Sequence, residues 1–106
     1  MAFILEGWQE KDFSNFLKNK GVGVIEFGAP WCAACKIIDP ILEGLSREHK
    51  DITFSKIDVS KNPGIASRMG VMSLPNILFI NGGKVKDQII GSTTKTSISE
   101  KIKKLK

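Results

Sequence analysis

The sequence predicts one α/β domain, with a central mixed β-sheet of four to five strands flanked by helices on both faces. Two observations predict this class. Short apolar, β-branched segments alternate with segments of helical periodicity, which favours parallel strands joined by helices. The last two strand segments are separated by a tight turn, which favours an antiparallel hairpin. The 106 residues suit a single domain spanning 1–106.

The first half of the chain is expected to contain, in order, a strand at 3–5, a helix, a strand at 22–27 and a long helix at 33–48. The first helix is indicated by the helical spacing of Trp8, Phe13, Phe16 and Leu17, and glycines follow it. In the second strand, apolar residues occupy both odd and even positions, so both faces carry apolar side chains and we expect both to be covered. The long helix has its apolar residues on one face.

The second half begins with a strand at 52–59 and a short helical turn at 62–69. Residues 76–80 and 85–90 read as two strands, and Asn81-Gly82-Gly83 between them is a strong hairpin signal. From Thr96 onward, Ile98, Ile102 and Leu105 share one face of a final helix.

The net charge of +5 derives largely from the lysines of the last six residues, which read as the solvent face of that helix. No basic stripe interleaved with aromatic residues is present, so nucleic-acid binding is not expected. No apolar run approaches the roughly 20 residues that a membrane span needs. The first residues lack the pattern of a secretory signal. We therefore expect a monomeric cytoplasmic protein without a membrane association.

The chain has two cysteines, Cys32 and Cys35, placed where a strand has ended and a helix begins. Residues three apart on a helix are close enough for a disulfide to form and open. Cys32 lies at the helix N-terminus, where N–H groups and the dipole stabilise a thiolate, and Lys36 adds positive charge. Cys35 lies one turn inside and should be shielded. The pair therefore predicts a nucleophile and a resolving thiol, against the alternative of two incidental buried cysteines.

A zinc site is the main rival interpretation of such a pair. It needs two further ligands, and the chain has no third cysteine and a single histidine, His49. We expect no metal. The chain also lacks a dinucleotide-binding or phosphate-binding glycine motif, so no bound cofactor is implied.

The order of motifs around the cysteines resembles the thioredoxin family over nearly the whole chain. The resemblance rests on the segment 24–36, on Pro40 within the helix, on the segments 56–59 and 62–63, on Leu74-Pro75, on the turn 81–83 and on Gly91. It implies the thioredoxin fold and a protein-disulfide reductase, an electron carrier that is re-reduced by a separate flavin- or ferredoxin-linked thioredoxin reductase. Its partners are then disulfide-containing proteins.

Three residues depart from the family's pattern. Ala33-Ala34 stands between the cysteines where Gly-Pro is usual, which should make the protein less reducing. Gly28 stands in place of an aromatic residue, so less side-chain bulk is expected beside the cysteines. Glu26 stands in place of a buried aspartate.

Glu26 interrupts an apolar strand, so burial is expected, with a solvent-facing glutamate as the alternative. A buried carboxyl responds by raising its pKa and becomes a proton acceptor near neutral pH. The resemblance implies that it takes the proton of Cys35. Lys56 matches the family's lysine near that acid and is expected to modulate it, against the alternative of an exposed strand lysine.

The remaining candidates concern substrate binding. The resemblance implies a cis bond before Pro75, with the backbone of Leu74 offering hydrogen bonds to an extended substrate, and with Gly91 nearby. Trp31, directly before the nucleophile, is expected to form an apolar contact surface rather than part of the core. Trp8 and His49 are interpreted as structural or surface residues.

Two other functions stay open at this level. Because Ala33-Ala34 is expected to make the protein less reducing, an oxidant or isomerase that runs the same exchange in reverse stays a possible function. The non-enzymatic alternative is a binding subunit with the same fold. The presence of both cysteines, Glu26 and Pro75 argues against it.

Overall fold

The computed structural model describes residues 4–106 and contains five strands and four helices in that part of the chain. In chain order they are β1 (Ile4–Trp8), α1 (Glu10–Lys18), β2 (Gly23–Gly28), α2 (Ala33–Glu48), β3 (Thr53–Asp58), α3 (Pro63–Arg68), β4 (Asn76–Asn81), β5 (Lys84–Ile90) and α4 (Lys95–Leu105).

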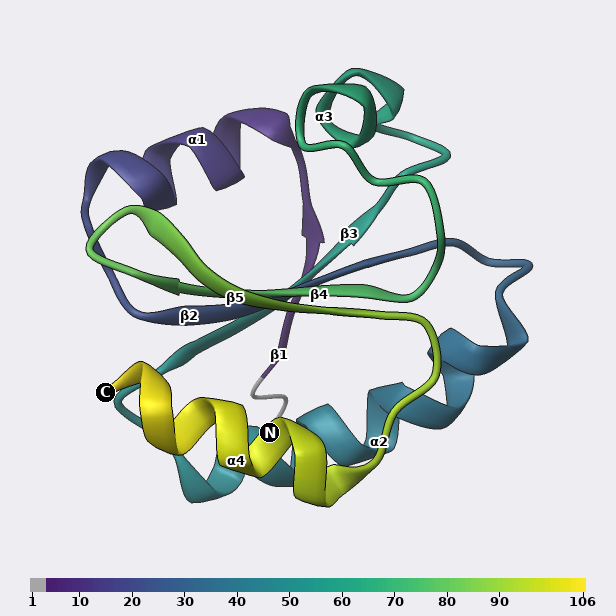
Figure 1. Ribbon diagram of the computed structural model, residues 1–106. Helices are drawn as coiled ribbons and strands as arrows, with labels where there is room; N and C mark the ends of the chain where they lie inside the picture. The colour runs from purple at the N-terminus through teal and green to yellow at the C-terminus, as the bar shows by residue number, and fades with distance from the viewer. Residues whose placement is uncertain (1–3) are drawn as a thin grey trace.

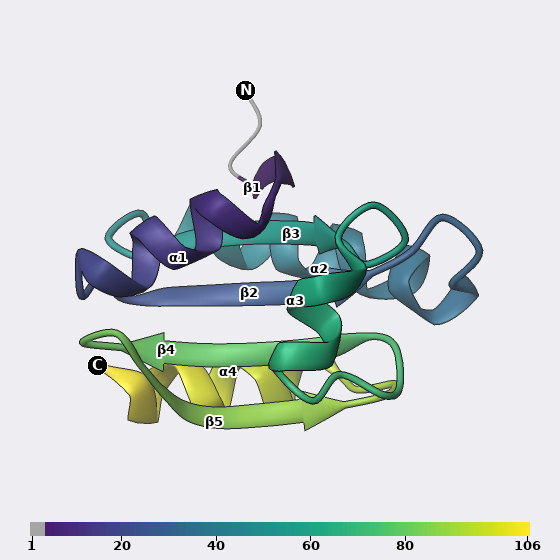
Figure 2. The same cartoon turned by 90° about the horizontal axis from the view of Figure 1, so that it is seen from above.

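The strands form one mixed sheet in the order β1-β3-β2-β4-β5. β1 and β2 both pair with β3 in parallel, whereas β4 pairs antiparallel with both β2 and β5. The expected class, a mixed sheet between helices, is confirmed. Helices α1 and α3 cover one face of the sheet, and α2 and α4 cover the other (Figures 1 and 2). β2 therefore lies at the centre of the sheet, between two layers of helices.

The alternation of side chains along β2 divides the interior into two apolar clusters. Val24 belongs to the cluster under α2 and α4, together with Ile38, Phe79 and Ile102. Ile25 and Phe27 belong to the cluster on the α1 and α3 side, with Phe13. Every residue of β2 is buried, as expected for a strand covered on both faces.

The first strand is longer than its expected range of 3–5, of which residue 3 lies outside the described part. It continues to Trp8 past an irregularity in its pairing with β3, where Gly7 has φ +75°. Trp8 thus ends a strand, and the interpretation that placed it with the following helix was wrong. Its spacing to Phe16 still reflects a contact, since their rings lie 5.6 Å apart.

No helix in residues 4–106 combines the length and the apolar character that crossing a membrane requires.

Candidate functional site

Cys32 and Cys35 lie at the C-terminal end of the central strand, where the chain leaves β2 and enters α2. They form a disulfide, and their Cα atoms are 5.3 Å apart. Cys32 is the N-cap of α2, and its sulfur accepts a hydrogen bond from the backbone N–H of Cys35 at 3.1 Å. The cysteines are thus linked within the first turn of one helix.

The two sulfurs have different surroundings. Cys32 keeps 9% of its surface exposed, and Cys35 is fully buried. The N-terminus of a helix stabilises a negative charge on Cys32, and α2 carries no acidic residue in its first turn to oppose it. A disulfide that opens here would leave the charge on Cys32 and the thiol on Cys35.

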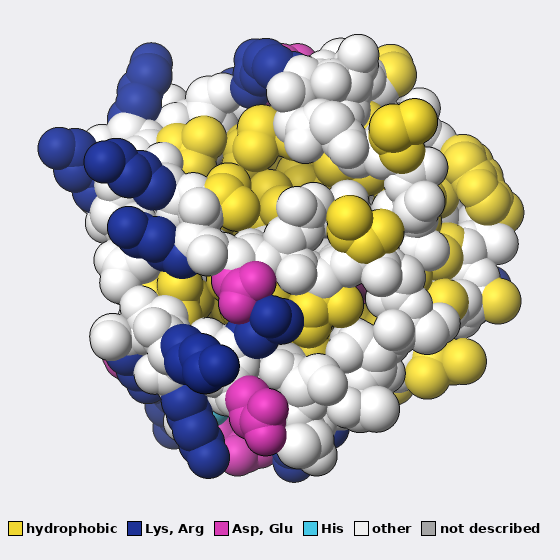
Figure 3. All heavy atoms as spheres, viewed as in Figure 1, with side chains coloured by type: hydrophobic (Ala, Val, Ile, Leu, Met, Phe, Trp, Pro, Cys, Tyr) yellow, Lys and Arg dark blue, Asp and Glu magenta, His cyan; other side chains and the backbone are white. Residues whose placement is uncertain are grey.

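Large apolar side chains are exposed at this end of the molecule. Trp31 is 71% exposed and Met72 is 95% exposed. The loop that holds Met72 precedes β4, and β4 runs antiparallel to β2, so both residues lie where β2 ends. Apolar side chains gather at the right edge of the space-filling view, whereas lysines and arginines gather at the opposite edge (Figure 3).

Pro75 lies at the same end of the sheet. The Leu74–Pro75 peptide bond is cis, the isomer that the resemblance implies. Asn76, the next residue, pairs with Phe27 of β2 and with Ile90 of β5. The backbone N–H of Gly91 donates to the carbonyl of Pro75 at 2.8 Å. The register therefore brings residue 75 beside the strand end that leads to the cysteines.

Glu26 is buried in β2, with 1% of its surface exposed. This excludes the alternative of a solvent-facing glutamate. Its carboxyl lies on the side of the strand that faces Cys35: a Cβ at Gly28 would lie 3.5 Å from Glu26 Oε2 and 3.2 Å from Cys35 Sγ. The Glu26 carboxyl and the Cys35 sulfur thus both lie beside Gly28.

Lys56 belongs to β3 and occupies the position paired with Glu26. Its ammonium group also forms an ion pair with Asp39 of α2, with 2.5 Å between Nζ and Oδ2. These two side chains are 24% and 31% exposed, so the pair is partly shielded from water. Sequence reasoning missed Asp39, although its spacing of four from Cys35 places it on the same face of α2.

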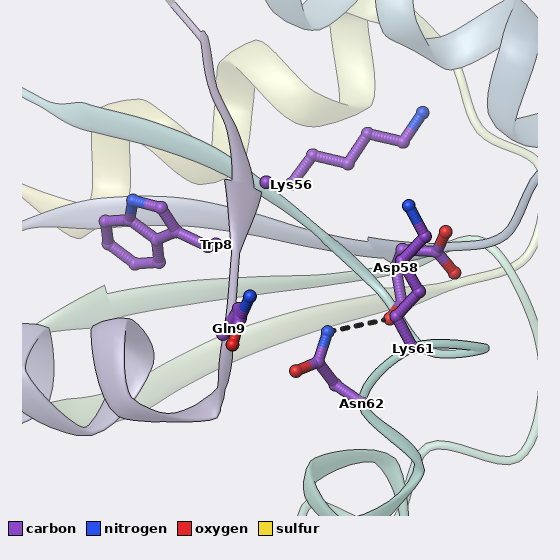
Figure 4. A pocket seen from close by; sticks show the side chains of 7 residues that line it. Trp8, Gln9, Lys56, Asp58, Lys61 and Asn62 are labelled. Carbon is purple, nitrogen blue, oxygen red and sulfur yellow. Dashed lines mark hydrogen bonds between the residues drawn. The ribbon is translucent and has the colours of Figure 1, made fainter.

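Two pockets adjoin Lys56. The larger, of about 390 Å³, lies between β1 and the segment after β3, and Figure 4 shows Lys56 extending away from Trp8 there. Asn62 closes one side by donating to the carbonyl of Asp58 at 3.0 Å. The smaller pocket, of about 240 Å³, reaches Gly28 and Asp39. Of these two, the smaller one is lined by Gly28, where a Cβ would approach both the Glu26 carboxyl and the Cys35 sulfur.

Trp8 and His49, which the sequence indicates are structural or surface residues, lie away from this site. Trp8 packs on Phe16 at the β1–α1 side. His49 is the C-cap of α2, at the far end of that helix, and its Nδ1 lies 3.3 Å from Lys106 Nζ. No group of three or more His, Cys, Asp or Glu side chains gathers as a metal site in residues 4–106.

A disulfide across one turn at the start of a helix, with one sulfur reachable and one buried, defines a domain of the thiol–disulfide exchange class. The family model for thioredoxin matches residues 5–104 of the chain. The chain belongs to the thioredoxin family.

Curated relatives show the same relationship. The chain is 40% identical over 85 residues to the thioredoxin of Mycoplasmoides gallisepticum, a match that covers 80% of this chain and 84% of that one. It is 35% identical to the thioredoxin of Chlorobaculum thiosulfatiphilum, with 88% of each chain covered. A match at 37% identity to the chloroplastic M-type thioredoxin of Pisum sativum covers 76% of this chain. The chain spans only about half, 48%, of that plant protein.

Solved structures agree in fold. The oxidized form of mitochondrial thioredoxin 3 from Saccharomyces cerevisiae superposes with a TM-score of 0.86 at 32% identity, covering 95% of this chain and 94% of that one. The thioredoxin NaTrxh from Nicotiana alata superposes with a TM-score of 0.90 at 25% identity, covering 99% and 94%.

Proposed function

We propose that this protein is a protein-disulfide reductase that works by dithiol exchange through Cys32 and Cys35. The observation that carries the proposal is the asymmetry of the pair: Cys32 caps α2 and is partly exposed, while Cys35 is buried behind it. Exchange through a mixed disulfide needs one reachable thiolate and one thiol held in reserve. Membership of the thioredoxin family supports the same activity.

The reaction proceeds in two exchanges. The Cys32 thiolate attacks one sulfur of a substrate disulfide, forming a mixed disulfide and releasing the other substrate sulfur as a thiolate. Cys35 then loses its proton and attacks Cys32, which forms the Cys32–Cys35 disulfide and releases the second substrate sulfur. The substrate gains two electrons, and the protein loses two.

Glu26 is our candidate for the group that accepts the Cys35 proton. It is buried, and like Cys35 Sγ it lies beside Gly28. A carboxyl in such a site is a suitable general base for a thiol because burial disfavours its charged form. Lys56, paired with Glu26 across the β2–β3 ladder, is the candidate for modulating it.

For substrate binding we propose Trp31, Leu74, Pro75 and Gly91. Trp31 offers exposed apolar surface next to Cys32, and the last three lie where β4 begins and β5 ends. An extended substrate segment would add to this edge through main-chain hydrogen bonds of Leu74. Met72, exposed in the loop before Leu74, extends the same surface.

Turnover requires a separate reductase, for which we propose a flavin- or ferredoxin-linked thioredoxin reductase, with no cofactor bound to this chain. We further propose that the protein acts as a cytoplasmic monomer. The bacterial thioredoxins among its relatives support this compartment, and the chloroplastic M-type relatives make the plastid the alternative.

Reduction of insulin by dithiothreitol tests the activity. The wild-type protein should accelerate insulin precipitation, and Cys32→Ser should abolish the acceleration. Pre-reduced Cys35→Ser, mixed with insulin after the dithiothreitol has been removed, should instead accumulate a mixed disulfide, visible by mass spectrometry and cleaved when dithiothreitol is added back. Equal acceleration by wild type and Cys32→Ser would reject the assignment.

An oxidant or isomerase is the second candidate, and Ala33-Ala34 is the feature that favours it. Helix-favouring residues between the cysteines keep α2 intact up to Cys32 and so stabilise its thiolate, which favours the reduced protein. Equilibration with glutathione separates the two directions. A potential well above that of the cytosolic glutathione pool would reject the reductase.

A further inference from the structure

Gly28 lies at the point where three functional groups come close together. A Cβ at this residue would lie 3.2 Å from Cys35 Sγ and 3.5 Å from both Glu26 Oε2 and Lys56 Cε. Any side chain here would therefore press on the resolving sulfur and approach the carboxyl. Because residue 28 is a glycine, these groups approach its backbone more closely than a side chain would allow, and the pocket that Gly28 lines opens beside them.

A pocket of about 240 Å³ begins at this opening. Water occupies about 30 Å³ per molecule in the liquid, so the pocket can hold several. Its charged lining consists of Lys36 and Asp39 from α2 and of Lys56 and Asp58 from β3. The pocket thus connects Gly28 with charged, partly exposed side chains.

The Asp39–Lys56 ion pair links the two elements across this pocket. Asp39 Oδ2 accepts from Lys56 Nζ at 2.5 Å. The other carboxylate oxygen of Asp39, Oδ1, is buried and accepts no hydrogen bond from residues 4–106. A buried acceptor of this kind is ordinarily satisfied by water. The pair therefore places both a cation and a water-binding oxygen at the pocket.

We propose that the pocket beside Gly28 is the exit for the proton that Cys35 gives up, and that Asp39 positions Lys56 in it. The inference rests on the proposed function, in which Glu26 accepts this proton. The S–H bond of Cys35 breaks and its proton goes to the Glu26 carboxylate, while its sulfur bonds to Cys32 and the bond from Cys32 to the substrate sulfur breaks, releasing that sulfur as a thiolate. The carboxylic acid then passes the proton to water in the pocket, which restores the base for the next cycle.

The charge of Asp39 sets the pH at which this base works. The charged groups around Glu26 and the pocket are two lysines and two aspartates, Lys36, Asp39, Lys56 and Asp58, while β4 presents apolar Ile77 opposite Glu26. The positive and negative charges of this set balance. Removing the charge of Asp39 leaves an excess positive charge, which stabilises ionised Glu26 and makes it lose its proton at lower pH.

Asp39→Asn is the matching variant, because it keeps the side-chain shape and removes the charge. Glu43→Gln is the control: it removes a carboxylate from the same helix, in an exposed ion pair with Arg47. The measured step is the attack of Cys35 on Cys32. Excess 5,5′-dithiobis(2-nitrobenzoate) converts Cys32 rapidly to its mixed disulfide, and stopped-flow absorbance follows release of the second thionitrobenzoate between pH 5 and 9.

The rate–pH midpoint of Asp39→Asn should lie about 0.5–1 pH unit below that of the wild type, and that of Glu43→Gln should coincide with it. Gly28→Ala, which places a methyl group in the opening, should slow this step about three-fold or more without slowing the first attack by Cys32. Thermal unfolding checks that each variant is folded.

The outcomes separate the two proposals. If Glu26→Gln alters the profile but Asp39→Asn leaves it unchanged, the exit is rejected and the proposed role of Glu26 stands, whatever Gly28→Ala does, since its methyl group also presses on Cys35 Sγ. If Glu26→Gln has the wild-type profile, Glu26 is not the base, and both that role and this inference fall.

Discussion

Glu26 of β2 and Lys56 of β3 are paired positions in the parallel ladder at the centre of the sheet, and both lie on the face that α2 covers. The acid is 1% exposed, whereas the lysine reaches out to an ion pair with Asp39. One pair of neighbouring positions thus connects the interior, where Cys35 is buried, with the surface.

Replacing the buried acid should separate catalysis from stability. Glu26→Gln should slow the attack of Cys35 on Cys32 by about 10-fold or more at pH 7, since general bases contribute roughly 100- to 10,000-fold. It should not lower the free energy of unfolding at pH 8, because a buried charged form is costly. Stopped-flow kinetics and urea unfolding measure the two effects. A variant that is slow only because it is unstable would contradict the assignment.

Removing the exposed indole should weaken substrate contact. Trp31→Ala should raise the KM for insulin about 10-fold, equivalent to ~1.4 kcal/mol. Reaction with dithiobisnitrobenzoate should change little, since a small reagent contacts little of the surface. The control is Val85→Ala, at the β4–β5 turn on the opposite end, where Val85 is 43% exposed. Equal KM values for the two variants would remove Trp31 from the contact surface.

The residues between the cysteines should set the redox potential. Replacing Ala33-Ala34 by Gly-Pro introduces a proline without an N–H in the first turn of α2 and so removes one donor near Cys32. The thiolate is then less stabilised, and the potential should become more negative by about 30 mV or more, a ten-fold change in the equilibrium constant. Equilibration with dithiothreitol of known redox ratio measures it. A shift to more positive potentials would contradict the helix-start explanation.

The ion pair between β5 and α4 should stabilise the fold only while its acid is charged. The hydrogen bond from Lys101 and that from the Gln88 backbone lower the pKa of Asp87 below its usual 3.8. A lowered pKa contributes stability above that value, and the contribution is lost as the pH falls below it. Lys101→Met should therefore reduce the free energy of unfolding at pH 7, by about 0.2–1 kcal/mol, and by less at pH 2.5.

Urea unfolding at both pH values measures this difference. Lys103→Met is the control on the same helix, because Lys103 is exposed and forms no ion pair with residues 4–106. An equal loss at both pH values would show that Lys101 acts through its apolar stem instead.

The central part of the site could be predicted because it depends on short-range pattern. The spacing of Cys32 and Cys35, the strand before them and the helix after them all lie within one segment. The burial of Glu26 followed from apolar neighbours on both sides in the same strand. Such inferences need only the periods of strands and helices.

The remaining features depend on segments that are distant in the chain. The partner of Lys56 is Asp39, 17 residues away, and their contact requires α2 to lie across β3. Whether Met72 is exposed or buried depends on whether a distant segment packs over its loop, and the local sequence does not reveal this. The sequence predicts too short a β1, because the strand resumes its pairing with β3 at Trp8 after the irregularity near Gly7. No alternation of apolar and polar residues indicates this continuation.

The cysteine pair closes across a single turn of α2, with Cα atoms 5.3 Å apart. That spacing is set by one helical turn, so we expect the bond to open and close with little displacement of the sheet or of the other helices. Under the proposed function, substrate proteins and the reductase would then meet nearly the same surface. The reactivity and the abundance of these partners, rather than a change in the shape of this protein, would then decide which of them exchanges with the cysteine pair. Each partner would have to dissociate from a surface that its reaction has left unchanged.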